Sequence, residues 1–485
     1  MKIRGLVKQH IDSFNYFINV GIKDIVNANS EIRSPQDENF FLKFKKIEIG
    51  KPSIEEDYIT NEINPHECRL RDVTYAAPII VDISYTRGRN IINKNGVRIG
   101  NMPIMLGSSN CHLNQKSDQE LAKIGECPYD PRGYFIIRGV EKVILIQEQM
   151  SKNRIIVEKD NKQNIIAQVT SSTHETKSRT SIIYHNDKFA MKHNIFTENL
   201  PICIVFKAMG IESDQEIAQF IGTQPQYLEQ MSLSILESSK QEVLTQEQAL
   251  NYIGIRVKSK INRTGPNATV KSRRDEAYDI LKEVVLTHVG DKQSSLLPKC
   301  RFIALMIRRI IEAMEDPSKI DDKDYYGNKR LELAGQLISL LFEDTFKRFQ
   351  SDLQKQINTN LQKNRNKKEP FDVHTCFRHD MITSSLDNAI STGNWSLKRF
   401  KMERAGVTQV LSRLSFISAL GMMTRINSQF EKSRKISGPR SLQPSQWGIL
   451  CPSDTPEGES CGLVKNLALT THVTTDQPVA ILINL

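Results

Sequence analysis

The hydrophobic pattern along the chain changes repeatedly between helical and strand-like spacing. Residues 6–26 carry apolar side chains at intervals of three and four, which predicts an amphipathic helix packed on a core. Residues 77–85 and 104–106 are short apolar runs between glycines and asparagines, which predict strands. Two further runs, 134–137 and 142–146, flank Arg-Gly-Val-Glu and predict two strands joined by a tight turn. This mixture predicts an α+β multidomain fold.

The middle of the chain, residues 160–300, has a pattern of its own and predicts a separate module. Strand-like runs cover 167–174, 182–185 and 202–207. Helical spacing covers 214–221, 246–252 and 274–289. Between the last two helical segments, the basic and polar residues 258–274 contain Gly-Pro and predict an exposed loop.

The last third of the chain is first helical. Apolar side chains follow one helical face in segments 302–314, 329–357 and 407–426. In the third of these helices, the side chains expected on the buried face are Val410, Leu411, Leu414, Ile417 and Leu420.

From residue 437 onward, prolines and glycines are too frequent for a long helix. Residues 447–450 and 463–467 are short apolar runs suited to buried strands. Between them, Thr-Pro-Glu-Gly at 455–458 has the proline and glycine positions of a type I turn. That turn would present the carboxylate of Glu457 at its tip.

Composition suggests a globular protein with a polyanionic partner. The 485 residues are 39% hydrophobic and 25% charged, a length that suggests roughly two to four domains. The net charge is +10 and the isoelectric point is near 9.0. A basic protein of this kind either binds a polyanion or has a solvated, lysine-rich surface.

The distribution of charge favours the first alternative. Residues 395–440 hold ten cations against two glutamates, a net charge of +8. The cations are Lys398, Arg399, Lys401, Arg404, Arg413, Arg425, Lys432, Arg434, Lys435 and Arg440. Clustering of this kind is typical of a surface that binds nucleic-acid phosphates and loses affinity as salt rises.

Several other kinds of chemistry lack their motifs. The eight cysteines form no CxxC pair, and the first residues lack the apolar core of a secretory signal, so we expect a reducing compartment. There is no GxxxxGK[ST], HExxH or GxSxG motif, and no stretch as apolar as a membrane helix. Two-metal polymerisation needs clustered aspartates, and no DxD group of this sequence lies in a polymerase-like setting. We therefore predict no metal site in this chain.

Three segments then point to a family. Residues 447–466, WGILCPSDTPEGESCGLVKN, resemble the signature of the second-largest (β-like) subunit of multisubunit DNA-directed RNA polymerases. Residues 133–148, GYFIIRGVEKVILIQE, and 324–335, DYYGNKRLELAG, resemble two further signatures in the order found in that family. Segments 66–79, 171–180 and 391–448 are most similar to the RNA polymerase III type.

The resemblance implies an RNA polymerase β-like architecture of protrusion, lobe and fork. The implied boundaries are 1–162 and 331–394 for the protrusion, 163–330 for the lobe, 395–472 for the fork, and 473–485 for the start of the following external region. The fork would border the DNA cleft.

The resemblance also implies where nucleic acid binds. The candidate contacts are Lys398, Arg399, Arg425, Lys432, Arg434, Lys435, Arg440, Gln443 and Gln446. Arg440 ranks first because proline and glycine constrain its approach. The alternative is that one or more of these cations face solvent, and for Lys432 and Lys435 the two alternatives weigh equally. The glutamines could bind the nucleic-acid backbone or base edges, or brace their own turn. Glu457 resembles a family glutamate near the nucleotide-addition site, without being a primary magnesium ligand.

The function implied is that of the N-terminal half of a polymerase III second-largest subunit, inactive alone, which lines the DNA cleft and active centre during RNA synthesis. Its partners would be the largest and smaller polymerase subunits, template and downstream DNA, the RNA–DNA hybrid and nucleoside triphosphates, in the nucleus and without a membrane. The largest subunit would hold magnesium, and zinc would bind only in the missing C-terminal part.

Family members of this type are more than twice as long, so a fragment, an incomplete gene product or half of a split subunit is expected. The alternative function is that of a stand-alone, non-catalytic nucleic-acid-binding or assembly protein.

Overall fold

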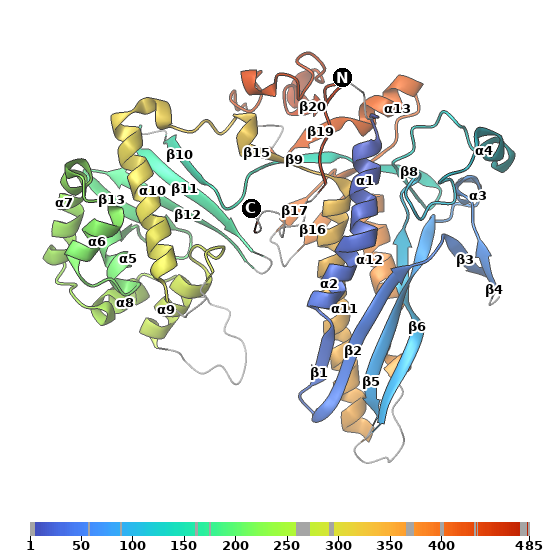
Figure 1. Ribbon diagram of the computed structural model, residues 1–485, viewed down its shortest axis with the longest axis horizontal. Helices are drawn as coiled ribbons and strands as arrows, with labels where there is room; N and C mark the ends of the chain where they lie inside the picture. The colour runs from blue at the N-terminus through green and yellow to red at the C-terminus, as the bar shows by residue number, and fades with distance from the viewer. Residues whose placement is uncertain are drawn as a thin grey trace. The chain divides into compact units, whose positions relative to one another are not determined.

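The chain forms two compact units, which are described separately (Figure 1). The computed structural model describes residues 5–56, 59–87, 90–160, 163–173, 176–258, 272–290, 295–364, 373–397, 402–430, 433, 435–475 and 483. The first unit comprises the described residues of 1–149, 329–398 and 402–485, and the second those of 150–328. Both units combine helices with antiparallel sheets, which confirms the predicted α+β class.

The first unit begins with a continuous helical segment, as the sequence predicts. It consists of α1 (Lys8–Tyr16), a π-helical turn (Phe17–Gly21) and α2 (Ile22–Ala28). Most of its apolar stripe is buried, and the ring of Phe14 lies 5.4 Å from that of Phe135 in an edge-to-face contact. The predicted role of this helix in packing is confirmed.

A long sheet and a long helix form the body of this unit. The antiparallel sheet has the order β1 (Glu31–Ser34), β2 (Asp37–Ile49), β5 (Ala76–Arg87) and β6 (Asn90–Pro103). Helix α11 (Ala334–Asn364) packs against it, with Phe346 of the helix 5.5 Å from Phe44 of β2, measured between ring centroids. The predicted apolar stripe of α11 is buried. The helix begins only at Ala334, however, because residues 329–332 form a strand.

A hairpin follows in the first unit, where the sequence predicts one. Strands β7 (Phe135–Ile137) and β8 (Val140–Ile144) pair antiparallel, with Ile137 opposite Val140. The two residues between them, Arg138 and Gly139, both have positive φ, at 50° and 75°. A two-residue turn of that hand matches the twist of paired strands. Residues 104–106, in contrast, are buried but do not form the predicted strand.

Shorter elements complete this part of the first unit. They are β3 (Ser53–Glu56), β4 (Ile59–Glu62), α3 (Pro65–Leu70), α4 (Asp118–Ile124), a 3₁₀ turn (Val373–Cys376), α12 (Asp380–Thr392), β16 (Trp395–Leu397) and β17 (Met402–Arg404).

The predicted helix over 407–426 is wrong. This segment forms β18 (Thr408–Val410), the short helix α13 (Phe416–Met423) and the start of β19 (Arg425–Ser428). Strand β18 pairs with β8, a partner far away in sequence that the local apolar spacing does not reveal. Leu414 and Ile417, expected on a buried face, are 93% and 77% exposed. Leu411 is buried.

A small sheet joins strands from distant parts of the first unit. Its order is β15 (Lys329–Glu332), β9 (Ile146–Met150), β19 and β20 (Val464–Asn466). Strand β19 runs parallel to β9 and antiparallel to β20. The predicted strand within 463–467 is confirmed. In 447–450, only Leu450 makes a strand-like bridge, to Leu467.

The second unit is a five-stranded antiparallel sheet covered by helices. The strands follow in sequence order: β10 (Ile155–Lys159), β11 (Ile165–Ser172), β12 (Lys177–His185), β13 (Lys188–His193) and β14 (Leu200–Pro201). The helices are α5 (Ile202–Ala208), α6 (Asp214–Ile221), α7 (Pro225–Lys240), α8 (Gln246–Ile255), α9 (Arg273–Glu283) and α10 (Leu297–Glu315), followed by 3₁₀ turns at Pro317–Lys319 and Tyr326–Asn328.

Most predicted elements of this unit are confirmed, but 202–207 is a helix and not a strand. Every side chain of α5 is buried, so the helix shows no polar face, and a continuous apolar run does not distinguish a buried strand from a buried helix. Helix α7 was not predicted. Most of residues 258–274, the predicted loop, lie outside the described residues. Within the described part of the chain, no helix combines the length and the apolar character needed to cross a bilayer.

Candidate nucleic-acid interface

The three segments that resemble family signatures meet in the small sheet of the first unit. Glu148 on β9 comes from the first, Lys329 on β15 from the second, and Lys465 on β20 from the third. Lys329 Nζ donates to Glu148 Oε1 at 2.9 Å, and Lys465 Nζ donates to Glu148 Oε2 at 3.0 Å. All three side chains are buried. Burial alone would raise the pKa of Glu148, but the two ammonium groups outweigh it and lower that pKa.

A second cluster lies at the edge of the same sheet. Arg404 Nη1 donates to Glu332 Oε2 at 2.6 Å, and its Nη2 donates to Gln149 Oε1 at 3.3 Å. Gln149 in turn donates to the other oxygen of Glu332. The side chains of Arg404 and Glu332 are only 12% and 10% exposed. Arg404 therefore connects β17 to β15 and does not face solvent.

A third network holds Arg413 against the β7–β8 hairpin. Its guanidinium donates to Asp130 Oδ1 at 2.7 Å and to Glu141 Oε2 at 2.8 Å. Arg69 donates to the other oxygen of Glu141 at 2.8 Å. Burial alone would raise the pKa of Glu141, but Arg413 and Arg69 together lower it. Arg404 and Arg413, two of the ten cations between residues 395 and 440, are thus paired with carboxylates of the same unit. The net charge of +8 therefore overstates the positive charge that this segment can present to a partner.

The predicted nucleic-acid contacts are only partly visible. Lys398, Arg399, Lys432 and Arg434 lie outside the described residues. Arg425 is half-buried on β19, opposite Asn466 of β20, and Lys435 is exposed in the loop that follows β19. Arg425 thus lies on β19 and Lys435 lies further along the chain, in the part where the resemblance implies that the fork meets nucleic acid.

The two candidate glutamines belong to a turn. Gln443 precedes the 3₁₀ turn Pro444–Gln446, and its carbonyl accepts a hydrogen bond from the Gln446 backbone N–H at 3.0 Å. The Gln446 side chain is buried, which favours the bracing role over base contact for this residue. Gln443 is half-buried.

Glu457 is exposed on a loop that runs from Pro452 to Leu463, which we call the Glu457 loop. The predicted type I turn is not formed. Glu457 has φ −76° and ψ 156°, which is extended, whereas the third position of a type I turn needs ψ near 0°. Glu457 instead precedes a 3₁₀ turn at Gly458–Ser460. The carboxylate is presented as predicted, but by a different backbone path.

Arg440 is held by the same loop. Its Nη1 donates to the backbone carbonyl of Glu459 at 2.7 Å and to that of Cys461 at 2.9 Å. The side chain is half-buried. These contacts were not predicted, because backbone carbonyls leave no mark in the pattern of charged residues.

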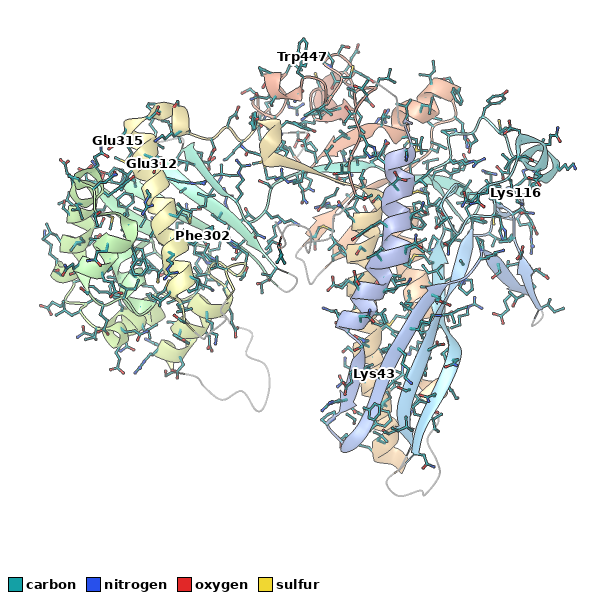
Figure 2. The ribbon with its side chains drawn as sticks, viewed as in Figure 1. Lys43, Lys116, Phe302, Glu312, Glu315 and Trp447 are labelled. Carbon is teal, nitrogen blue, oxygen red and sulfur yellow. The ribbon has the colours of Figure 1, made fainter. Side chains whose placement is uncertain are left out.

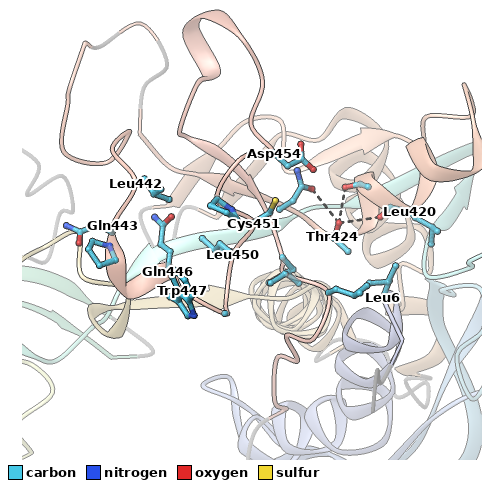
Figure 3. A pocket seen from close by; sticks show the side chains of 18 of the residues that line it. Leu6, Leu420, Thr424, Leu442, Gln443, Gln446, Trp447, Leu450, Cys451 and Asp454 are labelled. Carbon is cyan, nitrogen blue, oxygen red and sulfur yellow. Dashed lines mark hydrogen bonds between the residues drawn. The ribbon is translucent and has the colours of Figure 1, made fainter. Parts of the chain in front are cut away.

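An apolar pocket of about 650 Å³ lies beside these loops (Figure 3). Its walls come from α13, from the segment around the 3₁₀ turn at Pro444–Gln446, and from the residues that follow β20. Thr424 Oγ1 donates to Asn466 Oδ1 at 3.4 Å at its base. Trp447, expected in a buried strand, lines this pocket and is 93% exposed (Figures 2 and 3). Because its lining is mostly apolar, the pocket is better suited to hydrophobic contact than to binding phosphate groups.

Comparison with known proteins agrees with the signatures. Residues 5–384 match a family described as RNA polymerase beta subunit, and residues 409–473 match one described as RNA polymerase Rpb2, domain 3. The chain is 56% identical over 485 residues to DNA-directed RNA polymerase III subunit RPC2 of Saccharomyces cerevisiae, and 54% identical over 477 residues to that of Drosophila melanogaster. In both comparisons 98% of this chain is covered.

The fraction of each relative's length that this chain covers differs between relatives. This chain spans 41% of the length of each of these two relatives. It is also 34% identical over 483 residues to DNA-directed RNA polymerase subunit Rpo2N of Methanococcus vannielii, where it covers 94% of the relative and 98% of itself. It corresponds to the N-terminal part of the longer proteins.

Proposed function

Because this chain belongs to the RNA polymerase β-subunit family, we propose that it acts as the N-terminal portion of the second-largest subunit of a nuclear DNA-directed RNA polymerase of type III. In this role it lines the path of DNA and RNA while the assembled enzyme makes RNA from nucleoside triphosphates. Its partners are the largest and smaller polymerase subunits, template and downstream DNA, and the RNA–DNA hybrid.

One observation carries the proposal for the site. The three signature segments meet through Glu148, Lys329 and Lys465 in one small sheet, and that sheet supports both the segment with Arg425 and Lys435 and the Glu457 loop. A buried ion-pair network is demanding in geometry, so it fixes the register of the strands that carry it. Cations on the segment after β19 then contact phosphates without reading sequence.

The metals of the reaction are assigned to other parts of the enzyme. Within the described ranges of this chain, no three His, Cys, Asp or Glu side chains are grouped so that they could hold a metal ion. The residues seen here do not fit a magnesium site. The proposal assigns magnesium to the largest subunit and zinc to the C-terminal part of the longer relatives, as the family resemblance implies.

Site-specific cross-linking tests this function. A photoreactive amino acid replaces Lys435 in the assembled polymerase, and a matched variant carries it at Lys43, an exposed lysine on β2 (Figure 2). We expect cross-links to DNA or RNA in a transcribing complex from position 435 and none above background from position 43. Equal cross-linking from both positions would overturn the proposed location of the nucleic acid.

A further inference from the structure

We infer that Arg440 is a positioning residue that holds the Glu457 loop in place, and that it acts in nucleotide addition through Glu457 instead of through nucleic-acid phosphates. This inference rests on the proposed function, because Glu457 is given its role there. The contacts of Arg440 with the loop, however, are independent of any ligand.

The first support is the bond pattern of the guanidinium. Its Nη1 bridges the carbonyls of Glu459 and Cys461, at 2.7 Å and 2.9 Å, and so holds two points on the return side of the loop. The two carbonyls are neutral, so they do not cancel the positive charge of Arg440. They do fix the position of its guanidinium group against the loop.

The second support is the close approach of the two backbones. Gly462 has φ +74°, and a Cβ atom there would lie 2.3 Å from the Arg440 carbonyl oxygen and 2.6 Å from its Cα. Any side chain at position 462 would therefore push the loop away from Arg440. A glycine in the left-handed region allows this contact without strain.

The third support is that the two segments joined by Arg440, the Glu457 loop and the turn at 437–441, are each held by hydrogen bonds of their own. Thr455 Oγ1 accepts from the Gly462 N–H at 2.8 Å and donates to the Val464 carbonyl at 3.0 Å, which closes the base of the loop. On the other side, the N–H of Ser441 donates to the Ser437 carbonyl at 3.1 Å, so the turn that carries Arg440 is also ordered. Arg440 thus joins two ordered segments.

The consequence concerns Glu457 itself. It is exposed and extended, and its position depends on the loop that carries it. The described contacts that tie the far side of this loop to the 437–441 turn are those of Arg440 and the backbone approach at Gly462. Loss of the guanidinium leaves the base of the loop closed at Thr455 but frees the segment that follows Glu457.

Hydrogen exchange in the assembled polymerase measures the brace directly. Arg440→Met keeps the apolar stem and removes the donors, whereas Arg440→Lys keeps the charge. With Arg440→Met we expect the amides of Cys461 and Leu463 to exchange about tenfold faster, as the loss of one stabilising contact implies, while the Gly462 amide stays protected by Thr455. With Arg440→Lys we expect a smaller increase, because an ammonium group can still donate to both carbonyls. The β7–β8 hairpin is the internal reference and should be unchanged. Unchanged exchange in the loop would overturn the inference.

Kinetics then test whether the brace acts through Glu457. We expect Arg440→Met and Glu457→Gln to change the same parameter of nucleotide addition, kcat or KM, and the double variant to differ from Glu457→Gln by less than about twofold, because residues that act as a unit are non-additive. Independent, multiplicative effects with a smaller salt dependence of DNA affinity would overturn the inference in favour of phosphate contact. If Glu457→Gln changes nothing while loop exchange accelerates, the brace stands and the proposed role of Glu457 fails.

Discussion

Lys329 on β15 and Glu148 on β9 form an ion pair 2.9 Å long in which both side chains are almost fully buried. Lys465 approaches the same carboxylate from β20. Removing water from charged groups is costly, so such a cluster is stable only when its geometry is kept. One buried cluster thereby links residues from three separate signature segments. The contribution of the cluster to stability can be tested by substitution.

Glu148→Gln should lower the free energy of unfolding by about 3–5 kcal/mol, because it leaves two ammonium groups buried without their carboxylate. Urea denaturation of the purified protein measures this change. The matched control is Glu48→Gln on β2, where the side chain is 59% exposed and pairs with an exposed lysine. That change should cost less than about 1 kcal/mol. Equal losses would mean that the buried cluster contributes no more than a surface pair.

Stability should fall as the pH drops from 7 to 5. Burial lowers the pKa of His193 to about 4, and burial also lowers the pKa of His10, although its hydrogen bond to the Met423 carbonyl opposes the shift. The unfolded chain takes up protons near pH 6.5 while these folded histidines stay neutral, so stability is complete above that pH and decreases below it. Each contributes a loss of up to about 1.4 kcal/mol per pH unit. His193→Phe should reduce this slope in urea denaturation series, and an unchanged slope would contradict the assignment.

Leu411→Ala and Leu414→Ala should behave differently. Leu411 is 5% exposed and Leu414 is 93% exposed. Truncation of the first should cost about 2–5 kcal/mol through lost burial and a cavity, and truncation of the second less than about 0.5 kcal/mol. Thermal or urea unfolding distinguishes them. Similar large losses at both positions would support the continuous helix over 407–426 that the structure replaces.

Arg425→Ala and Lys435→Ala should weaken DNA binding by the assembled polymerase, if the proposed function holds. Each should reduce the slope of log affinity against log salt by about 1, because one phosphate contact is lost. Arg413→Ala is the comparison, since its guanidinium is bound to Asp130 and Glu141. It should leave the slope unchanged and cost about 1 kcal/mol of stability, a modest loss because the side chain is 44% exposed. A reduced slope for Arg413→Ala would show that the network opens to nucleic acid.

Elements with a clear local signal were predictable from the sequence. The helix at the start of the chain, the stripe of α11 and the β7–β8 hairpin each follow from spacing or turn chemistry within a few residues. Helix α5 was not predictable in this way, because a helix buried on all sides has no polar face to give it a period. The boundaries of protrusion, lobe and fork stay a prediction.

The sequence indicates a candidate region for the site but not the contacts within it. The cations between 395 and 440 indicate a candidate segment, yet Arg404 and Arg413 are bound to carboxylates from distant strands. Charge counting cannot show this, since the partners lie far away in sequence. One local hint is present: Glu148 lies two residues after the apolar run of 142–146, where a charged residue needs a buried partner.

The second unit is closed at its base, because the N–H of Ser151 donates to the carbonyl of Asn328 at 2.8 Å. Strands β9 and β15, which flank the unit in sequence, are neighbours in the small sheet. Along the chain, the second unit is therefore inserted between two neighbouring strands of one sheet. An inserted unit of this kind can be altered or exchanged by design while β9 and β15 remain paired.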